Sequence, residues 1–264
     1  MKADKSKYSN QGHIPTGLIS LDNLLGGGIA LGKITEFAGS YSVGKSTLAL
    51  QIIAAAQKKH DCLLVDTEYS FTIPYGEKLG IDCKHLDIIQ MRLAEDMLNA
   101  VEEWATNHKK SLIVLDSVGG ILPREEAEKS SESRSIGVQA RLIASFCRKI
   151  IGILAENENA LVITNHTFIS IDSGKLKSSG GEKLAYHRSY WITLRPVFGK
   201  TVSRATDGSK KVKYIEAELR KEKGMDTAEG KKCELILVAK GGFANEKPET
   251  KRGRPPCVAP LSPK

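Results

Sequence analysis

The chain has 264 residues, of which 41% are apolar and 27% charged, a composition typical of one large globular domain plus a tail. Its net charge is +8, and it has no N-terminal apolar segment and no apolar run long enough to span a bilayer, so we expect neither export nor membrane insertion. The five cysteines are odd in number, scattered and never in C-x-x-C spacing, so the sequence suggests neither a disulfide framework nor a zinc site and fits a reducing cytoplasm.

A short apolar run, expected to be a strand, leads directly into GSYSVGKST at residues 39–47. Gly39 is followed after four residues by Gly44, Lys45 and Ser46, which is the P-loop pattern. Small residues let backbone amides surround phosphate oxygens, and the next helix N-terminus adds partial positive charge. We expect Lys45 to reach the β- and γ-phosphates and Ser46 to hold Mg²⁺; the alternative is a tight strand-to-helix turn. The expected nucleotide-contacting residues here are Gly39, Ser40, Tyr41, Ser42, Val43, Gly44, Lys45, Ser46 and Thr47.

Short apolar runs alternate with stretches of helical periodicity along the chain. The runs predict buried strands at residues 34–37, 62–65, 112–115 and 160–164. Apolar residues recur at helical spacing over residues 93–104 and 136–154. This alternation implies βαβ crossovers and an α/β fold with a mostly parallel sheet. Three consecutive strands are then expected to end the sheet in antiparallel hairpins, at residues 190–194, 212–219 and 233–238.

Two carboxylates lie where a nucleotide site would need them. Asp116 ends the run SLIVLDS, at the carboxyl end of a strand, where α/β proteins bind ligands. It is expected to hold Mg²⁺, directly or through water, and a strand-capping aspartate is the alternative. Glu68 follows the strand at residues 62–65 by three residues and suits a carboxylate that polarises the attacking water. A surface glutamate is the alternative interpretation.

Five motifs occur in an order that resembles the RecA family of recombinases. They are TGLISLDNLLGGG (16–28), the P-loop, LLVDTEYSFTIPYGEKLGID (63–82), LIVLDS (112–117) and SIGVQARLIASFCRKI (135–150). The resemblance implies a RecA-like P-loop ATPase core that takes ATP and Mg²⁺, at about residues 15–243. A short segment at residues 1–14 would precede this core, and a tail at residues 244–264 would follow it.

The resemblance also assigns roles outside the P-loop. Glu68 resembles the family's catalytic glutamate, and Tyr75, in PYGEKLG, resembles the tyrosine that stacks on adenine. Asn165 and His166 end a strand where the family has a polar pair that senses the γ-phosphate, and the histidine is similar to that of UvsX-type phage recombinases. On spacing alone, His166 could equally be a satisfied strand-end histidine. Thr72 stands where the family usually has an aspartate near adenine, which leaves purine selectivity open.

Two lysines complete the set that the resemblance implies. Lys221 and Lys223, in LRKEKG, resemble lysines that reach across a subunit interface to the neighbour's phosphates. Without the resemblance they would be a solvated charge run. The expected catalytic residues are thus Glu68, Lys45, Lys221, Lys223 and His166.

The resemblance also implies two DNA-binding loops, at residues 129–137 and 167–179. Both are polar, as expected of segments that become ordered only on the phosphate backbone. Phe168 is expected to be a wedge between bases. The side chains assigned to phosphates are Arg134, Arg141, Lys175 and Lys177. For each of these residues a plain surface role is equally open.

The C-terminal quarter carries most of the positive charge. Residues 200–264 hold sixteen Lys and Arg against nine Asp and Glu, which favours a polyanionic partner, nucleic acid first, over a solvated lysine-rich surface. The tail is polar and proline-rich, so we expect it to be disordered when free. KRGRPP, at residues 251–256, contains an AT-hook core, in which glycine lets the backbone enter a narrow A·T minor groove between arginines. A merely basic tail is the alternative. The residues of the hook are Arg252, Gly253, Arg254 and Pro255.

Together these features predict an ATP-dependent, phage-encoded DNA recombinase in the cytoplasm of a bacterial host. It would bind single-stranded DNA, assemble along it and promote homologous pairing and strand exchange. Its expected partners are single-stranded DNA, duplex DNA, further copies of the chain and a loader or single-strand-binding protein. Fifteen residues precede Thr16, too few for the N-terminal helix and linker that join RecA subunits, so filament formation is less strongly expected than ATP binding.

Two alternative functions therefore stay open. One is a RecA-fold ATPase that binds single-stranded DNA, in annealing or replication, without strand exchange. The other is a non-catalytic accessory protein that binds DNA through the AT-hook. The intact set of Lys45, Glu68 and Asp116 argues against the second.

Overall fold

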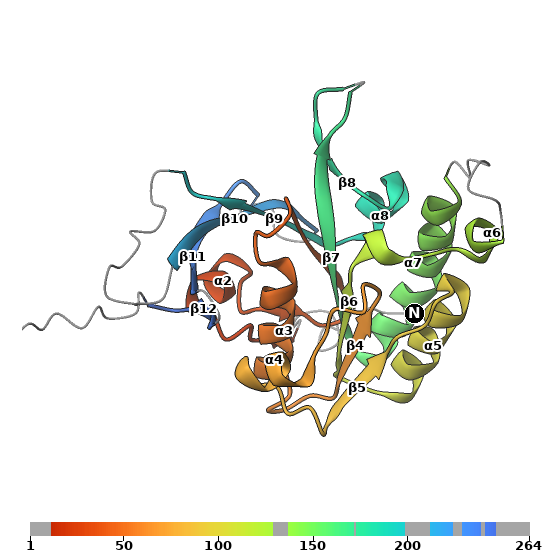
Figure 1. The fold of residues 1–264 in the computed structure, drawn as a ribbon, viewed down its shortest axis with the longest axis horizontal. Helices are drawn as coiled ribbons and strands as arrows, with labels where there is room; N and C mark the ends of the chain where they lie inside the picture. Colours follow the sequence, from red (N-terminus) through yellow and green to blue (C-terminus); the bar gives the residue numbers. More distant parts are fainter. Residues whose placement is uncertain are drawn as a thin grey trace, which may run out of the picture.

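A computed structural model describes residues 12–128, 137–171, 173–198, 212–223, 229–238 and 241–246 (Figure 1). The helices are α2 (Ile19–Leu24), α3 (Lys45–Ala56), α4 (Ile73–Lys78), α5 (Ala94–Asn107), the 3-10 turn η1 (Val118–Gly120), α6 (Arg124–Ala127), α7 (Val138–Asn157) and α8 (Gly181–His187). The strands are β1 (His13–Ile14), β2 (Ile29–Ala30), β3 (Ile34–Gly39), β4 (Cys62–Asp66), β5 (Leu86–Ile89), β6 (Leu112–Asp116), β7 (Ala160–Ile169), β8 (Leu176–Ser178), β9 (Tyr190–Pro196), β10 (Val212–Glu222), β11 (Lys232–Val238) and β12 (Gly242–Ala244).

The central sheet has the strand order β12-β11-β10-β9-β3-β7-β6-β4-β5. β3 lies between β7 and β9 and is parallel to both, and β6, β4 and β5 continue the parallel part. β9 to β12 are antiparallel neighbours. The predicted α/β fold, with a mostly parallel sheet that ends in antiparallel hairpins, is confirmed. As a result, the carboxyl ends of β3, β4, β6 and β7 share one edge of the sheet.

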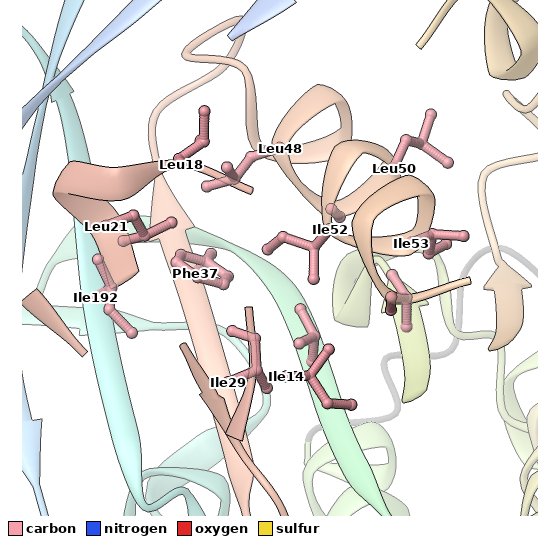
Figure 2. Close-up of a cluster of buried hydrophobic side chains, with 14 of the residues drawn as sticks. Ile14, Leu18, Leu21, Ile29, Phe37, Leu48, Leu50, Ile52, Ile53 and Ile192 are labelled. Carbon is pink, nitrogen blue, oxygen red and sulfur yellow. The ribbon is translucent and has the colours of Figure 1, made fainter. Parts of the chain in front are cut away.

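Helices cover both faces of the sheet. α2, α3 and α4 pack on one face, where Phe37 and Ile52 are fully buried (Figure 2). α5, α7 and α8 pack on the other face, around residues such as Ile150. Neighbouring residues of one strand, Leu63 and Leu64, belong to different faces, which explains why the strands are continuous apolar runs. Burial of each such side chain contributes about 1.5–3 kcal/mol to folding.

The segment expected to be the second DNA-binding loop is a β-hairpin instead of a loop. β7 continues to Ile169, five residues beyond the predicted strand, and pairs with β8 in the register Thr167 to Ser178. The hairpin projects from the body of the molecule (Figure 1). Backbone pairing with β8 decides the structure here, because the return segment at residues 174–179 has a single apolar residue, Leu176, and so has no apolar pattern that would predict a strand.

The C-terminal edge of the core is fixed by two amide side chains. Gln51 of α3 accepts a hydrogen bond from the amide of Phe243 and donates one to its carbonyl oxygen at 2.9 Å. Asn245 accepts from the amide of Ile19 at 2.7 Å and donates to the carbonyl oxygen of Gly17 at 3.0 Å. Ordered contacts therefore reach two residues beyond the predicted end of the core, at residue 243. Over the described part of the chain, no helix is long and apolar enough to cross a membrane.

Candidate nucleotide-binding site

Sheet register brings the polar ends of four strands together. Gly39 pairs with His166 across β3 and β7, and Asp66 pairs with Asp116 across β4 and β6. Since these strands are parallel, residues that end them meet at the same edge. The motifs that lie far apart in the sequence therefore converge at the loop between β3 and α3.

The P-loop needs glycine at two positions. A Cβ atom on Gly39 would lie 2.5 Å from the carbonyl oxygen of Leu194, which is far inside contact distance. Gly44 has φ 100°, in the left-handed region, and a Cβ there would lie 3.0 Å from the ring of Phe243. Gly44 is also the N-cap of α3, so the free amides of the first helical turn lie next to the loop. This geometry fits a phosphate cradle.

Lys45 is buried in the P-loop. Its ammonium donates to the carbonyl oxygens of Gly39 at 3.1 Å and Ser40 at 2.9 Å. Burial lowers the pKa of Lys45 below its ordinary value, and the carboxylates of Asp116 and Glu68 offset part of this effect. The cation is therefore held within the loop.

His166 contacts this lysine directly. Its Nδ1 lies 3.4 Å from the ammonium of Lys45, and the ring of Tyr41 lies against the imidazole at a tilt of 34°, with centroids 4.4 Å apart. An ammonium can only donate, so the imidazole is a neutral acceptor in this contact. Burial and the charge of Lys45 lower the pKa of His166, while Glu68 and Asp116 act in the opposite direction. The predicted sensor residue is thus next to the predicted phosphate-binding cation.

Asp116 is buried at the end of β6 and accepts a hydrogen bond from the hydroxyl of Thr164. Burial raises the pKa of Asp116, the neighbouring Glu68 and Asp66 add to the rise, and hydrogen bonds from Thr164 and Ser46 lower it. A cation beside the carboxylate would offset this penalty. Among the described residues, no three His, Cys, Asp or Glu side chains group into a metal site. Ser46 and Asp116 fit Mg²⁺, which uses one or two protein ligands with phosphate oxygens and water.

The loop after β4 places Glu68 at the same edge. The hydroxyl of Ser117 donates to Oε1 of Glu68 at 2.5 Å. The carboxylate of Asp66 accepts the amides of Glu68 at 3.3 Å, Ser70 at 3.2 Å and Phe71 at 2.9 Å, so it shapes the loop. Sequence reasoning missed Asp66. Its position at the end of an apolar run, before polar loop residues, is the pattern that could have identified it.

Tyr75 approaches the P-loop from α4. Its hydroxyl lies 2.8 Å from the hydroxyl of Thr47. α4 begins after Thr72, whose carbonyl oxygen accepts the amides of Tyr75 and Gly76 at 3.1 and 3.0 Å. The structure therefore brings the residue predicted to contact adenine beside the last P-loop residue.

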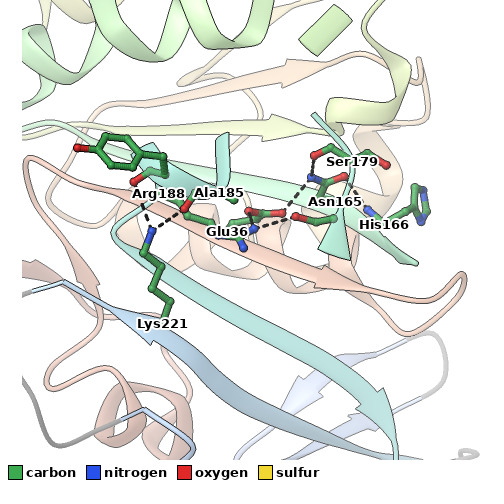
Figure 3. A network of polar contacts seen from close by, with 9 residues as sticks. Glu36, Asn165, His166, Ser179, Ala185, Arg188 and Lys221 are labelled. Atoms are coloured by element: carbon green, nitrogen blue, oxygen red, sulfur yellow. Dashed lines mark hydrogen bonds and ion pairs between the residues drawn. The ribbon is translucent and has the colours of Figure 1, made fainter. Parts of the chain in front are cut away.

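Asn165 points away from the P-loop, into a buried polar cluster that sequence reasoning missed (Figure 3). Its amide donates to Glu36 of β3 at 2.9 Å and to the carbonyl oxygen of Ser179 at 2.8 Å. Glu36 in turn forms a buried ion pair with Arg188. No local sequence pattern predicts this pair, because the two residues come from opposite ends of the core.

Comparison with known proteins identifies the family of this chain. The RecA N-terminal domain family matches residues 1–223. The chain belongs to this family. Protein RecA of Wolinella succinogenes is 34% identical over 190 residues, which are 70% of this chain and 54% of that protein. Protein RecA of Wolbachia pipientis subsp. Culex pipiens is 33% identical over 221 residues, 81% of this chain and 62% of that protein. The chain thus spans 54% to 62% of the length of these two RecA proteins.

The two lysines expected at a RecA subunit interface lie at the end of α8. Lys221 donates to the carbonyl oxygen of Ala185 at 2.5 Å, and Lys223 donates to that of Tyr186 at 2.5 Å. Lys223 also lies 4.7 Å from the centre of the Tyr186 ring, which is exposed. Burial lowers the pKa of Lys221 to about 8, and the charges of Lys223 and Arg188 contribute to this shift. The carbonyl groups that end α8 hold both ammonium groups there.

The residues expected to contact DNA fall on two elements of this RecA-family chain. Phe168, which is 48% exposed, and the exposed Lys175 belong to the β7–β8 hairpin. Lys177 of the same hairpin lies 3.5 Å from Glu182, and Arg141 of α7 lies 3.8 Å from Glu125. The remaining predicted DNA contacts lie outside the described residues: Arg134, Arg252, Gly253, Arg254 and Pro255.

Proposed function

We propose that the chain is a DNA-dependent ATPase of the recombinase type, which binds single-stranded DNA, assembles along it and promotes strand exchange. One observation carries this proposal: β7 bears His166 beside Lys45 and continues into the hairpin that bears Phe168 and Lys175. A single strand thus joins the candidate phosphate site to the candidate DNA-binding element. Membership of the RecA family supports the same function.

In the proposed reaction, the amides of the P-loop and Lys45 hold the phosphates of ATP. Lys45 exchanges the carbonyl oxygens of Gly39 and Ser40 for phosphate oxygens. Ser46 and Asp116 would hold Mg²⁺, which, when bound, neutralises charge on the phosphate oxygens. In P-loop ATPases, ATP hydrolysis depends mainly on placing charges around the transferred phosphate. Positioning therefore contributes more to the rate than covalent chemistry does.

Glu68 is the proposed base for the attacking water. Ser117 donates to Oε1, which fixes the carboxylate and leaves Oε2 to accept the proton of the water. His166 would lose its contact with Lys45 when the lysine turns to phosphate, and its ring could then contact the γ-phosphate. We also propose that Lys221 and Lys223 complete the site of a neighbouring copy.

The test is hydrolysis of ATP with and without single-stranded DNA, followed by electron microscopy with a non-hydrolysable ATP analogue and a strand-exchange assay. We expect DNA-stimulated turnover, helical filaments and joint molecules. Rings or single beads without strand exchange would identify a single-strand-binding ATPase instead. DNA binding without any turnover would contradict the enzymatic proposal.

A further inference from the structure

The Glu36–Arg188 ion pair takes no part in the chemistry proposed above, yet it is among the most deeply buried charges of the core. The exposed fractions of the two side chains are 0% and 5%. Glu36 lies on β3 two residues after Ile34, which packs against α5 and α7 residues on the same face. Burying two charges costs several kcal/mol each unless geometry and further hydrogen bonds compensate. A pair in this position therefore calls for an explanation.

The pair connects the P-loop strand to both strands of the hairpin (Figure 3). Oε1 of Glu36 accepts the Asn165 amide at 2.9 Å, and that amide also donates to the carbonyl oxygen of Ser179, just after β8. Arg188 donates to Oε2 of Glu36 and to the hydroxyl of Ser178, the last residue of β8, at 2.8 Å. A few buried hydrogen bonds thus link β3, β7 and the return strand of the hairpin.

The same contacts reach the candidate nucleotide sensor. The side-chain oxygen of Asn165 accepts the backbone amide of His166 at 2.8 Å. The amide of Ser179 donates to the carbonyl oxygen of His166 at 3.3 Å. A backbone movement at His166 would therefore disturb the bonds that Glu36 and Arg188 hold in place.

Two buried polar groups in and beside the network lack hydrogen-bond partners among the described residues in this arrangement. Nε of Arg188 and Nε1 of Trp191 are buried and have no hydrogen-bond partner within the described part of the chain. The guanidinium instead stacks 3.9 Å above the Trp191 ring. A buried network that is only partly satisfied in one arrangement can be better satisfied in a second one.

We propose that Glu36 and Arg188 are positioning residues that couple the nucleotide site to the β7–β8 hairpin. Binding of ATP beside Lys45 would then set the position of the hairpin where it joins the sheet. The inference rests on the proposed function, since it assumes that the hairpin binds DNA. The pair acts through Asn165 on one side and Ser178 on the other, and it contacts neither ligand.

The test compares the affinity for single-stranded DNA with and without a non-hydrolysable ATP analogue. The variant is the double substitution Glu36→Met with Arg188→Met, because replacing both members of a buried pair by apolar residues often preserves folding. We expect ATP affinity to be retained and the nucleotide-dependent gain in DNA affinity to fall by about tenfold. The control makes the same kinds of change at the Lys149–Glu102 pair, whose side chains are 56% and 19% exposed, as Lys149→Met with Glu102→Met, and should keep the full gain.

A second variant keeps the test decisive if the double variant does not fold. Ser178→Ala removes only the bond between Arg188 and β8, and we expect it to reduce the gain while ATP affinity stays unchanged. The inference would be overturned if the nucleotide-dependent gain in DNA affinity stays within twofold of the wild-type gain, either in a folded double variant or in Ser178→Ala. If the wild type itself shows no nucleotide-dependent gain, the proposed function fails, and that result is distinct from a failure of the coupling pair.

Discussion

Lys45 is the cation on which the proposed nucleotide site depends. We expect Lys45→Ala to raise the dissociation constant for ATP by about 10²-fold, since each charge-assisted hydrogen bond contributes about 1.5–3 kcal/mol. Tight, ATP-dependent binding of single-stranded DNA should disappear with it. Calorimetry with ATP and a DNA-binding titration measure the two effects. Lys59→Ala, an exposed lysine just after α3, is the control and should bind as the wild type does. Unchanged ATP-dependent DNA affinity in Lys45→Ala would contradict the coupled mechanism.

Substitution of Glu68 should slow ATP turnover without weakening the binding of ATP or DNA. In Glu68→Gln the amide cannot take the proton of water, so we expect kcat to fall by about 10²-fold or more. The affinities for ATP and DNA should stay close to wild type, because the P-loop contacts are intact. Single-turnover hydrolysis measures the rate, and Glu77→Gln, an exposed glutamate of α4, is the matched control. A kcat within a few-fold of wild type would remove Glu68 from its proposed role.

His166 should titrate in acid because its environment disfavours the charged form. Burial and Lys45 lower its pKa in the folded state below 6.5, so the unfolded chain takes up this proton first as the pH falls. The stability contribution of the neutral ring is then complete above pH 6.5 and is lost as the pH falls through the folded-state pKa. NMR titration of the imidazole checks this directly, with His166→Gln to assign the resonance. A midpoint at or above the ordinary value would show that burial and Lys45 together do not disfavour the charged ring in solution.

At the scale of elements, α8 and the end of β10 form the surface that holds Lys221 and Lys223. If these lysines complete a neighbour's site, neither Lys223→Ala nor Lys45→Ala protein should be active alone. A mixture of the two should regain activity, because some interfaces then pair an intact P-loop with an intact lysine. ATP hydrolysis across a range of mixing ratios measures this. A site closed within one chain predicts that every mixture stays inactive even when the two variants co-assemble.

The elements differ in how far the sequence alone could predict them. β3, β4 and β6 were predictable because strands buried on both faces are continuous apolar runs, and the P-loop because its glycines and lysine are local in sequence. The β7–β8 hairpin could not be predicted, since β8 has a single apolar residue, Leu176, and pairs with β7 through its backbone. The Glu36–Arg188 pair depends on tertiary packing, which brings together two residues 152 positions apart. Asp66 is an intermediate case: its acidic strand end is visible in the sequence, but its loop hydrogen bonds are not.

At the scale of the whole molecule, the core and the tail are proposed to have different DNA partners. The contacts of Asn245 place it with the core, so truncation after Glu246 leaves the described structure complete. Residues 247–264 contain five Lys and Arg against one acidic residue. We expect the truncated protein to bind duplex DNA more weakly and to keep its ATPase activity with single-stranded DNA, because the hairpin and the P-loop are untouched.

A charge-matched pair of variants separates groove recognition from simple attraction between charges. Arg252→Ala with Arg254→Ala and Lys247→Ala with Lys251→Ala each remove two positive charges, but only the first pair alters the RGRP core. Each lost phosphate contact flattens the salt dependence by about one unit, so all affinities must be compared at fixed salt. If the arginines enter a narrow minor groove, a preference for A·T-rich over G·C-rich duplex should disappear in the arginine variant and persist in the lysine variant. Equal losses in both variants, for every duplex and for single strands, would mean that the tail attracts DNA by charge alone.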